Sequence, residues 1–391
     1  MNFDEIIDRR GTHSSKWDMM EPIYSVPAAD GLAMWVADMD FRPPACVAEA
    51  LRGMLDHGIF GYFGDDRAYK EAIGWWMQTR HGWKVDPAAI FTTHGLVNGT
   101  AICVDAFTAP GDGVVLFTPV YHAFARVIRA AGRVVVECPL VNRDGRYEMD
   151  FAAYDAQMTG AETMVILCSP HNPGGRVWTR DELQGVADFA KRHDLVLVSD
   201  EIHHDLVYPG APRHTVMDLV DDTVRDRLVM LTATTKSFNI AGTHTGNVIV
   251  PDPALRARFA ARMAALGLSA NSFGMIMATA AYSPEGAGWI DALMTYLDGN
   301  RVLFDEGINA IPGLSSMPLE ATYLSWVDAS GTGMSSEEFT RRVEADAKIA
   351  VNHGASFGTG GEAFLRFNIA TPRARVAEAV ERLQKAFADL Q

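Results

Sequence analysis

The chain of 391 residues lacks the features of membrane, secreted and nucleic-acid-binding proteins. No apolar run approaches the ~18 residues of a membrane helix. The acidic start Met1–Glu5 also has no apolar core of signal-peptide length. The formal net charge is -15, whereas nucleic acids and anionic membranes bind basic surfaces. We therefore expect a cytoplasmic protein that binds neither nucleic acid nor a membrane.

Cysteine is scarce and badly spaced for cross-linking. Cys46, Cys103, Cys138 and Cys168 form no Cys-x-x-Cys pair, which disfavours disulfide frameworks and zinc knuckles. No Gly-x-Gly-x-x-Gly follows a first strand, so a nicotinamide-binding dehydrogenase is disfavoured as well. Repeats and low-complexity linkers are missing. With 48% hydrophobic residues, a chain of this length can bury a large core and favours two domains over one.

Short apolar runs alternate with helical patterns through the middle of the chain. The predicted helices are 181–193, with Thr179 as N-cap, and 253–266, with Pro253 in its first turn. Near-continuous apolar runs of this kind are typical of strands buried on both faces of a mostly parallel α/β sheet. These runs are Val114 to Thr118, Val134 to Cys138, Met164 to Cys168, Leu195 to Ser199, Leu228 to Thr232 and Asn247 to Val250.

The C-terminal third has a different pattern. Residues 288–311 and 373–390 show helical spacing, whereas 323–327 and 364–369 resemble strands. This mixture indicates a second, smaller α+β domain.

Polar residues follow three of the central apolar runs. Asn172, Asp200 and Lys236 would lie at the carboxyl ends of strands, where α/β sheets gather ligands. A lysine amine among hydroxyls can bond to an aldehyde cofactor, and a carboxylate can keep a pyridine nitrogen protonated. Each residue alone is a weak signal, since Asn-Pro-Gly is usually a turn. Their order and spacing together predict a pyridoxal phosphate site.

Several separated blocks carry a family resemblance over nearly the whole chain. The chain resembles the fold-type I pyridoxal phosphate enzymes of the class I/II aminotransferase superfamily, and most of all the MalY/PatB-type carbon-sulfur β-lyases. That resemblance implies a large cofactor-binding domain at 44–287 and a discontinuous small domain at 1–43 and 288–391. The blocks are Asp8-Arg9-Arg10-Gly11-Thr12-His13-Ser14 with Lys16-Trp17-Asp18, Met34-Trp35-Val36-Ala37-Asp38-Met39-Asp40-Phe41, Ser199-Asp200-Glu201-Ile202-His203 and Lys236-Ser237-Phe238-Asn239-Ile240-Ala241-Gly242.

The resemblance assigns roles to the strand-end residues. Lys236 would hold the cofactor covalently and then act as the base that removes the substrate's α-proton. Asp200 would pair with the pyridinium nitrogen, although a carboxylate here could also be only a strand-end turn or helix cap. Asn172 would hydrogen-bond the phenolic oxygen of the cofactor. His203 stands where many relatives carry a tyrosine for the same oxygen.

The cofactor's phosphate needs hydrogen-bond donors. Gly95-Leu96-Val97 would present backbone N–H groups at the start of a helix, where the helix dipole favours an anion. Thr234 and Thr235 would add hydroxyls. Many relatives carry an arginine eight residues after the lysine, and here that position is His244, a departure that the lyase branch often shares. Thr243 is a second departure, since an apolar residue is usual there.

The remaining roles concern substrate binding and assembly. Tyr121 would stack on the pyridine ring and protonate a departing thiolate, and Arg366 would bind the substrate α-carboxylate. Trp35 and Ala37 would line the substrate pocket together with Asn172. Tyr62 resembles the tyrosine that reaches the phosphate from a neighbouring subunit, which implies a homodimer with shared active sites.

The adjacent histidines allow one alternative interpretation. His203 and His204, with Asp200 and Asp205, could be read as metal ligands. In an extended segment, however, adjacent side chains point to opposite faces and cannot converge on one ion. We therefore expect no metal site.

These observations lead to one expected function and two rivals. The expected function is a pyridoxal phosphate-dependent β-elimination of cystathionine or a related cysteine S-conjugate, which gives pyruvate, ammonia and a thiol. An aminotransferase would use the same residues and differ only in where Lys236 returns the proton. A cofactor-binding ligand sensor without catalysis is the rival from another class, but regulators of that kind carry an additional DNA-binding segment.

Overall fold

A seven-stranded sheet forms the centre of the computed structural model, which describes residues 1–390. Its strand order is β2-β10-β9-β8-β7-β3-β4, and only β10 runs against its neighbours. The predicted mostly parallel sheet is confirmed, and each of the six predicted strands is present within two residues at either end. The strands are β2 (Ile90–Thr93), β3 (Gly113–Leu116), β4 (Val134–Glu137), β7 (Glu162–Cys168), β8 (Val196–Asp200), β9 (Leu228–Thr232) and β10 (Gly246–Ile249).

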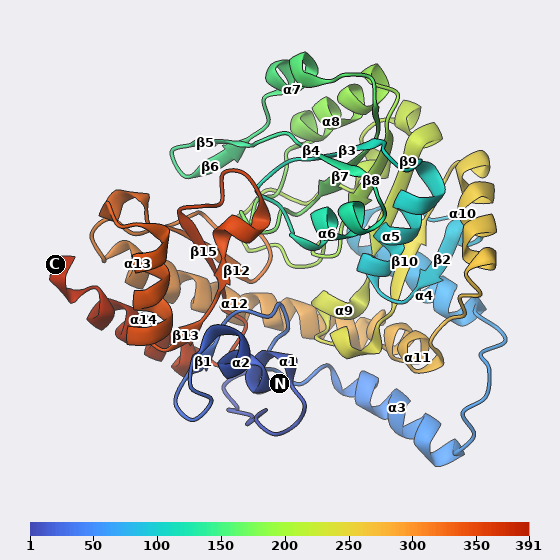
Figure 1. The fold of residues 1–391 in the computed structure, drawn as a ribbon. Helices are drawn as coiled ribbons and strands as arrows, with labels where there is room; N and C mark the ends of the chain where they lie inside the picture. Colours follow the sequence, from blue (N-terminus) through green and yellow to red (C-terminus); the bar gives the residue numbers. More distant parts are fainter. Residues whose placement is uncertain (391) are drawn as a thin grey trace.

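Helices cover both faces of this sheet (Figure 1). On one face, α5 (Leu96–Phe107), α6 (Ala123–Ala130) and α10 (Pro253–Ala265) share a buried cluster with alternate strand residues such as Val114. The neighbouring residue Val115 belongs to the other cluster, on the face that α8 (Arg180–Arg192) covers. Burial on both faces explains why the strands read as continuous apolar runs.

The start of α8 matches its sequence signal. The Thr179 hydroxyl accepts from the backbone N–H of Glu182, and the Glu182 carboxylate accepts from the backbone N–H of Thr179. This reciprocal capping box satisfies two of the N–H groups that a helix start leaves free. The predicted N-cap is therefore confirmed.

A second, four-stranded antiparallel sheet belongs to the C-terminal third. It packs with two helices at the predicted places, α12 (Pro284–Asn309) and α14 (Arg373–Ala386). The predicted helix 373–390 ends earlier than expected, because the chain turns into a 3₁₀ segment at Ala388–Leu390. The strands are β11 (Ser315–Ser316), β12 (Leu324–Asp328), β14 (Asn352–His353) and β15 (Phe364–Asn368).

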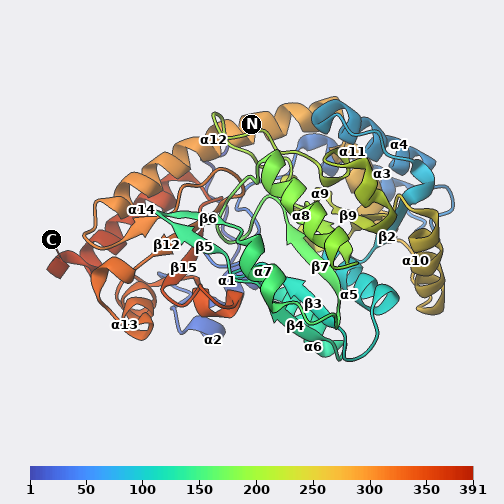
Figure 2. The ribbon, with the colours of Figure 1, turned by 90° about the horizontal axis from the view of Figure 1, so that it is seen from above.

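The N-terminal segment lies against this second sheet region. Its strand β1 (Leu32–Ala33) pairs in parallel with β13 (Ile349–Ala350), more than 300 residues later. Figure 2 shows α12 running along the molecule from α11 (Ser272–Ala281) to α14. The predicted division at 44 and 287 remains a prediction, and residue 287 falls inside α12.

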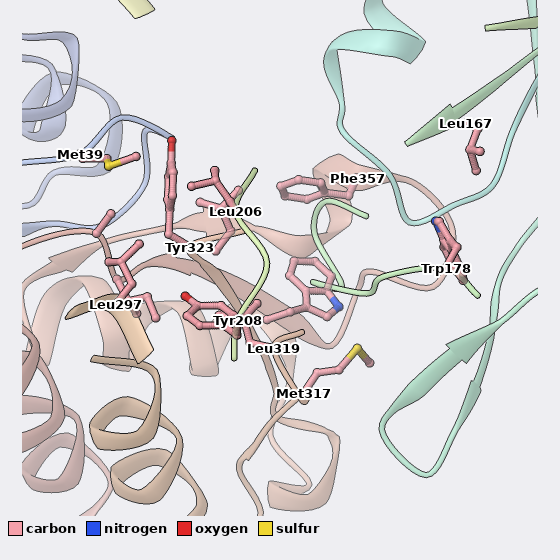
Figure 3. Close-up of a cluster of buried hydrophobic side chains, with 14 of the residues drawn as sticks. Met39, Leu167, Trp178, Leu206, Tyr208, Leu297, Met317, Leu319, Tyr323 and Phe357 are labelled. Carbon is pink, nitrogen blue, oxygen red and sulfur yellow. The ribbon is translucent and has the colours of Figure 1, made fainter. Parts of the chain in front are cut away.

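One buried cluster continues from the large sheet into the C-terminal third. Figure 3 shows part of it, with Leu167 of β7 in the same cluster as Leu297 of α12 and Tyr323 beside β12. A shared core of this kind fixes the two sheets relative to each other. Within residues 1–390, no helix combines the length and the apolar character needed to cross a membrane.

The remaining elements are short or peripheral. They are α1 (Ser15–Asp18), α2 (Met20–Tyr24), α3 (Ala45–His57), α4 (Arg67–Trp76), β5 (Val141–Arg143), β6 (Arg146–Glu148), α7 (Phe151–Gln157), α9 (Thr234–Ser237) and α13 (Ser336–Arg341).

Candidate active site

A cavity of about 680 Å³ opens at the carboxyl ends of β7, β8 and β9. Its walls come from the loops after these strands, the N-terminal segment, the start of α5 and strand β15. Most of the residues predicted for the site lie in its lining. They are Trp35, Ala37, Gly95, Leu96, Val97, Tyr121, Asn172, Asp200, His203, Thr235, Lys236, His244 and Arg366.

Lys236 lies in the short helix α9 that follows β9. Its Nζ donates to the backbone carbonyl of Ala37 at 2.6 Å. Burial lowers the pKa of the amine to about 8. An amine with a pKa this close to neutrality has a sizeable uncharged fraction, which is the form that attacks an aldehyde or accepts a proton.

Asp200 ends strand β8 and is buried. One carboxylate oxygen accepts from the backbone N–H of Ile202 at 3.1 Å, so the strand-end turn that the sequence allowed is present. The residue also lines the cavity. Burial raises the pKa of its carboxyl to about 7, and a cationic ligand beside it would favour the ionised form.

His203 is on a turn, where we expected an extended segment. The backbone N–H of His204 donates to Glu201 O, and that of Leu206 donates to His203 O. The extended prediction was wrong because the Asp200 side chain bonds to the following backbone and starts a turn. Burial lowers the pKa of His203 well below its ordinary value, so its ring is neutral in the cavity.

Arg366 reaches the cavity from β15, an inner strand of the second sheet. Its guanidinium donates to Asn172 Oδ1 at 2.9 Å and Trp35 O at 3.1 Å, and also to Asn352 Oδ1. The side chain is buried, and burial lowers its pKa to about 10. The Asn172 contact places a residue predicted to bind the cofactor directly beside the one predicted to bind the substrate.

Tyr121 lies just before α6 and lines the same cavity. Its ring meets His122 and Phe124 edge to face, with centroids 5.0 Å and 5.5 Å apart. Burial raises the pKa of its phenol, which therefore stays protonated at neutral pH. A protonated phenol can act as a general acid.

The amino end of α5 supplies the expected anion site. Gly95 is its N-cap with φ +82°, a conformation that only glycine adopts without strain. The first N–H groups of a helix have no partner within the helix, and the helix dipole favours an anion there. Both Leu96 and Val97 line the cavity at this end.

Two of the residues predicted to contact the phosphate, Thr234 and Tyr62, do not line the cavity. Thr234 is buried but does not line the cavity, in contrast to Thr235. Thr243, the unexplained departure, has a local role, because its hydroxyl donates to Ile240 O at 2.8 Å. Tyr62 also lies outside this cavity and is fully exposed in the loop between α3 and α4.

The charged N-terminal blocks build the wall that faces Lys236. Arg9 donates to Asp38 at 2.8 Å and to Asp40 at 2.9 Å. Asp40 is buried and also accepts from Lys16 Nζ at 3.0 Å and Trp17 Nε1 at 2.9 Å. These contacts fix the chain just after Ala37 and give the resembling blocks a structural purpose.

Three further side chains hold the same segment, and sequence reasoning missed all three as site residues. Asn239 accepts from Met39 N and donates to Met39 O, while Asn368 donates to the carbonyls of residues 36 and 38. Tyr323 Oη donates to Ala37 O at 3.0 Å. Asn239 could have been identified from the sequence as a polar residue three positions after Lys236. No local sequence pattern points to Asn368 or Tyr323.

A buried histidine–carboxylate network lies behind α9. Asp205 accepts from Ser237 Oγ at 2.7 Å and Trp76 Nε1 at 3.0 Å, and it contacts His81 Nε2 at 2.8 Å. Burial opposes ionisation of Asp205, but the charge of His204 and hydrogen bonds from both histidines outweigh it and hold its pKa well below the ordinary value. The ligand atoms of His81, His204 and Asp205 lie within 4.8 Å of one another.

This network differs from the metal interpretation weighed from the sequence. Asp200 and His203 line the cavity, whereas His204 and Asp205 belong to the network with His81. The carboxylate oxygens of Asp205 already accept hydrogen bonds from neutral and charged donors, which is the usual arrangement of a buried ion pair. We interpret the network as a support for the segment that carries Lys236.

The cavity suits an aldehyde cofactor that carries a pyridine ring and a phosphate. Three buried nitrogens of lining residues, His122 Nδ1, His203 Nδ1 and Arg366 Nε, have no hydrogen-bond partner within residues 1–390. An amine of lowered pKa, a buried carboxyl group and a free helix start surround the same space. These groups match the aldehyde, ring nitrogen and phosphate of pyridoxal phosphate respectively.

Comparisons with known proteins agree with this site. Residues 31–383 match the family model "Aminotransferase class I and II". Cystathionine beta-lyase PatB of Bacillus subtilis is 40% identical over 99% of this chain and 100% of that protein. Protein MalY of Escherichia coli is 31% identical over 98% of both chains.

A solved structure agrees in fold as well. Cystalysin from Treponema denticola, which contains a pyridoxal 5'-phosphate cofactor, superposes with a TM-score of 0.95 at 35% identity and covers 100% of this chain and 99% of its own. The resemblance seen in the sequence blocks is confirmed, and so is the fold-type I architecture. The chain belongs to the aminotransferase class I and II family.

Proposed function

We propose that this protein is a pyridoxal phosphate-dependent carbon-sulfur β-lyase that acts on cystathionine or a related cysteine S-conjugate. The observation that carries the proposal is the convergence of Lys236, Asp200 and Arg366 on one cavity. The chain is also 40% identical to a cystathionine β-lyase over nearly its full length, which supports the same reaction class. The products would be pyruvate, ammonia and a thiol.

The residues divide the work of cofactor binding. Lys236 would hold the cofactor covalently, Asp200 would pair with its ring nitrogen, and Asn172 and His203 would bind its phenolic oxygen. When bound, pyridoxal phosphate supplies an electron sink for the substrate's α-carbon. The N–H groups of Leu96 and Val97, with Thr234, Thr235 and His244, are the proposed phosphate donors. Thr234 has the weakest support, since it does not line the cavity.

The chemical steps need a base, an acid and a substrate clamp. Lys236, an amine of lowered pKa, would be the base that takes the substrate's α-proton. Tyr121, with its pKa raised by burial, keeps the proton that a departing thiolate needs. Arg366 binds the α-carboxylate, and Trp35 and Ala37 line the pocket around it.

We also propose a cytoplasmic homodimer with shared sites. The loop between α3 and α4 exposes the apolar side chains Ile59, Phe60 and Tyr62, and a contiguous exposed apolar patch is typical of an interface. In the dimer, Tyr62 would reach the partner's phosphate. The four cysteines, all free within the described residues 1–390, fit a reducing compartment.

The dimer proposal has a direct test. Tyr62→Phe alone should weaken cofactor retention, measured by absorbance after dialysis. Mixing this variant with Lys236→Ala subunits creates dimers in which one site combines intact Lys236 with a wild-type Tyr62 from the other subunit. Recovery of retention in the mixture supports sharing, whereas no recovery places the role of Tyr62 within its own subunit.

The reaction class is tested with cystathionine and no added keto acid. We expect pyruvate and free thiol in equal amounts. His244 stands where many relatives carry an arginine. A transaminase would need that arginine to retain a cofactor that is not covalently bound. A lyase would depend on it less, because Lys236 would hold the cofactor covalently between turnovers. Strict keto-acid dependence without thiol release would establish an aminotransferase instead, and binding without any turnover would favour a sensor.

A further inference from the structure

One charged residue in the cavity has no part in the chemistry proposed above. Lys236 and Asp200 are assigned to the cofactor, Arg366 to the α-carboxylate, and the amino end of α5 to the phosphate. Arg126 lines the same cavity and has none of these tasks. An uncommitted cation in an active-site cavity is suited to bind an anionic part of the substrate.

The surroundings of Arg126 leave its guanidinium free. It extends from the first turn of α6 and is exposed, and within residues 1–390 its side chain has no hydrogen-bond or ion-pair partner. Arg129, three residues further along the same helix, instead approaches Glu137 at 4.0 Å, where it lies outside this cavity. The two arginines therefore share a helix and a degree of exposure but differ in access to the site.

A second unsatisfied group lies beside Arg126. His122 lines the cavity, and its Nδ1 is buried without a partner within residues 1–390. Burial, together with the charges of Arg366 and Arg126, lowers the pKa of His122 to about 4, so its ring is neutral and can donate through one nitrogen. A cation and a neutral donor side by side make a binding site for one anionic group.

The position of Arg126 suits a contact with the substrate better than a contact with the cofactor's phosphate. Arg126 lies one helical turn after His122, and its backbone N–H donates to His122 O at 3.2 Å. His122 and the Arg366 guanidinium both pack against the ring of Phe357, at 5.6 Å and 5.0 Å from its centroid. Tyr121 is the proposed acid for the leaving sulfur and directly precedes His122. Arg126 is thus near the group that departs.

We propose that Arg126 and His122 form a leaving-group subsite for a carboxylate carried by the departing thiol. This inference rests on the proposed lyase function. Its preferred substrates are cysteine S-conjugates with a second carboxylate on the sulfur substituent, held by Arg366 at one end and Arg126 at the other. A guanidinium pairs with a carboxylate through two parallel N–H donors, which fixes orientation as well as charge.

The test uses two conjugates of nearly equal shape and different charge. S-carboxymethyl-L-cysteine carries a carboxylate on its leaving group, and S-carbamoylmethyl-L-cysteine carries a neutral amide in its place. For each holoenzyme, kcat/KM is measured from thiol release with both conjugates. We expect Arg126→Ala to lower the acid-to-amide ratio of kcat/KM by about fivefold, as for one partly exposed ion pair.

Arg129→Ala is the matched control, because it removes the same charge from the same helix. We expect it to leave the ratio unchanged. Equal losses for both conjugates in Arg126→Ala, or an unchanged ratio, would overturn the subsite. So would a loss of cofactor on dialysis with an unchanged ratio, which would make Arg126 a phosphate anchor.

A charge reversal gives a second measure that does not depend on loss of activity. Arg126→Glu should raise kcat/KM for S-aminoethyl-L-cysteine, whose leaving group is cationic, relative to the carboxymethyl conjugate. No shift in this preference contradicts the proposal even if the alanine variant is unstable. A wild-type enzyme that releases no thiol from any of the conjugates would instead overturn the lyase function, and the subsite with it.

Discussion

The cavity has two opposite walls that are built in different ways. Asn172, Asp200 and Lys236 form the strand-end wall, which follows directly from three parallel strands ending at one edge of a sheet. Residues 34–41 form the N-terminal wall, which contains no helix or strand. Buried ions and amide side chains from distant segments hold it instead.

This difference separates chemistry from positioning. The strand-end wall carries the amine, the carboxylate and the amide, while the N-terminal wall offers the backbone carbonyl of Ala37 to Lys236 and Tyr323. Backbone hydrogen bonds between the strands fix the first wall, so it needs few side-chain contacts to hold it in place. The second wall depends on a buried ion pair, and such pairs are costly to break even where their net contribution is small.

The largest effect is expected at the strand-end wall. Lys236→Ala should abolish turnover and the covalent link to the cofactor, because no other lysine lines the described cavity. Borohydride reduction followed by peptide mapping should place the label on Lys236. The buried Lys16 is the informative control, since its amine is committed to Asp40. A label on Lys16 or any other lysine would contradict the site.

Breaking the N-terminal wall should instead cost stability. Asp40→Ala removes the nearest carboxylate from the buried Lys16 and leaves it only Asp38, with Oδ1 at 3.9 Å. We expect a loss of about 3 to 5 kcal/mol in the free energy of unfolding. Urea denaturation of the apoprotein measures it. Asp65, which pairs with Arg67 on the surface, provides the control, because its replacement by alanine should change far less. Similar losses for the two variants would show that the N-terminal wall does not depend on this ion pair.

The same contrast explains what the sequence could predict. The apolar runs located six of the seven strands of the large sheet, all but β2, and the strand-end rule then brought Asn172, Asp200 and Lys236 together. Family resemblance was needed for Tyr121 and Arg366, because nothing in their local pattern indicates a shared cavity.

Hydrogen bonds between distant segments were beyond sequence reasoning. Asn239 contacts Met39 across 200 residues, and periodicity carries no information about such a pair. The extended conformation expected at His203 and His204 was wrong for a local reason, because the Ile202 N–H donates to the Asp200 side chain and a turn begins there. The sequence likewise shows His204 and Asp205 side by side, but no sequence pattern connects them to His81, which completes their network.

Arg366 links the second sheet to the strand-end wall, because it extends from β15 and its guanidinium donates to Asn172. Arg366→Ala should lower kcat/KM by a factor that corresponds to about 2 to 4 kcal/mol of transition-state stabilisation. This is the loss of one strong charge-assisted contact to the substrate carboxylate. Arg366→Lys keeps the charge but lacks the two-pronged geometry, and should recover only part of the loss. A near-normal kcat/KM for the alanine variant would mean that the α-carboxylate binds elsewhere.

The smallest loss of stability is expected at Ser237, which connects the Lys236 segment to the buried network around Asp205. Ser237 follows Lys236 and donates to the buried Asp205 carboxylate at 2.7 Å. Ser237→Ala removes one hydrogen bond to a charged group, and about 1.5 kcal/mol of unfolding free energy should be lost. Since Asp205 keeps Trp76 and His81 as partners, the network should survive.

A double-mutant cycle distinguishes this support from a general packing effect. Asp205→Asn alone should cost more than Ser237→Ala, because it removes the charge that balances His204. If the Ser237 hydroxyl acts through Asp205, the double variant should lose less stability than the sum of the two single losses. Simple additivity would show that Ser237 stabilises α9 without the carboxylate. In either case the label on Lys236 should persist, because the strand-end wall itself places that residue at the cavity.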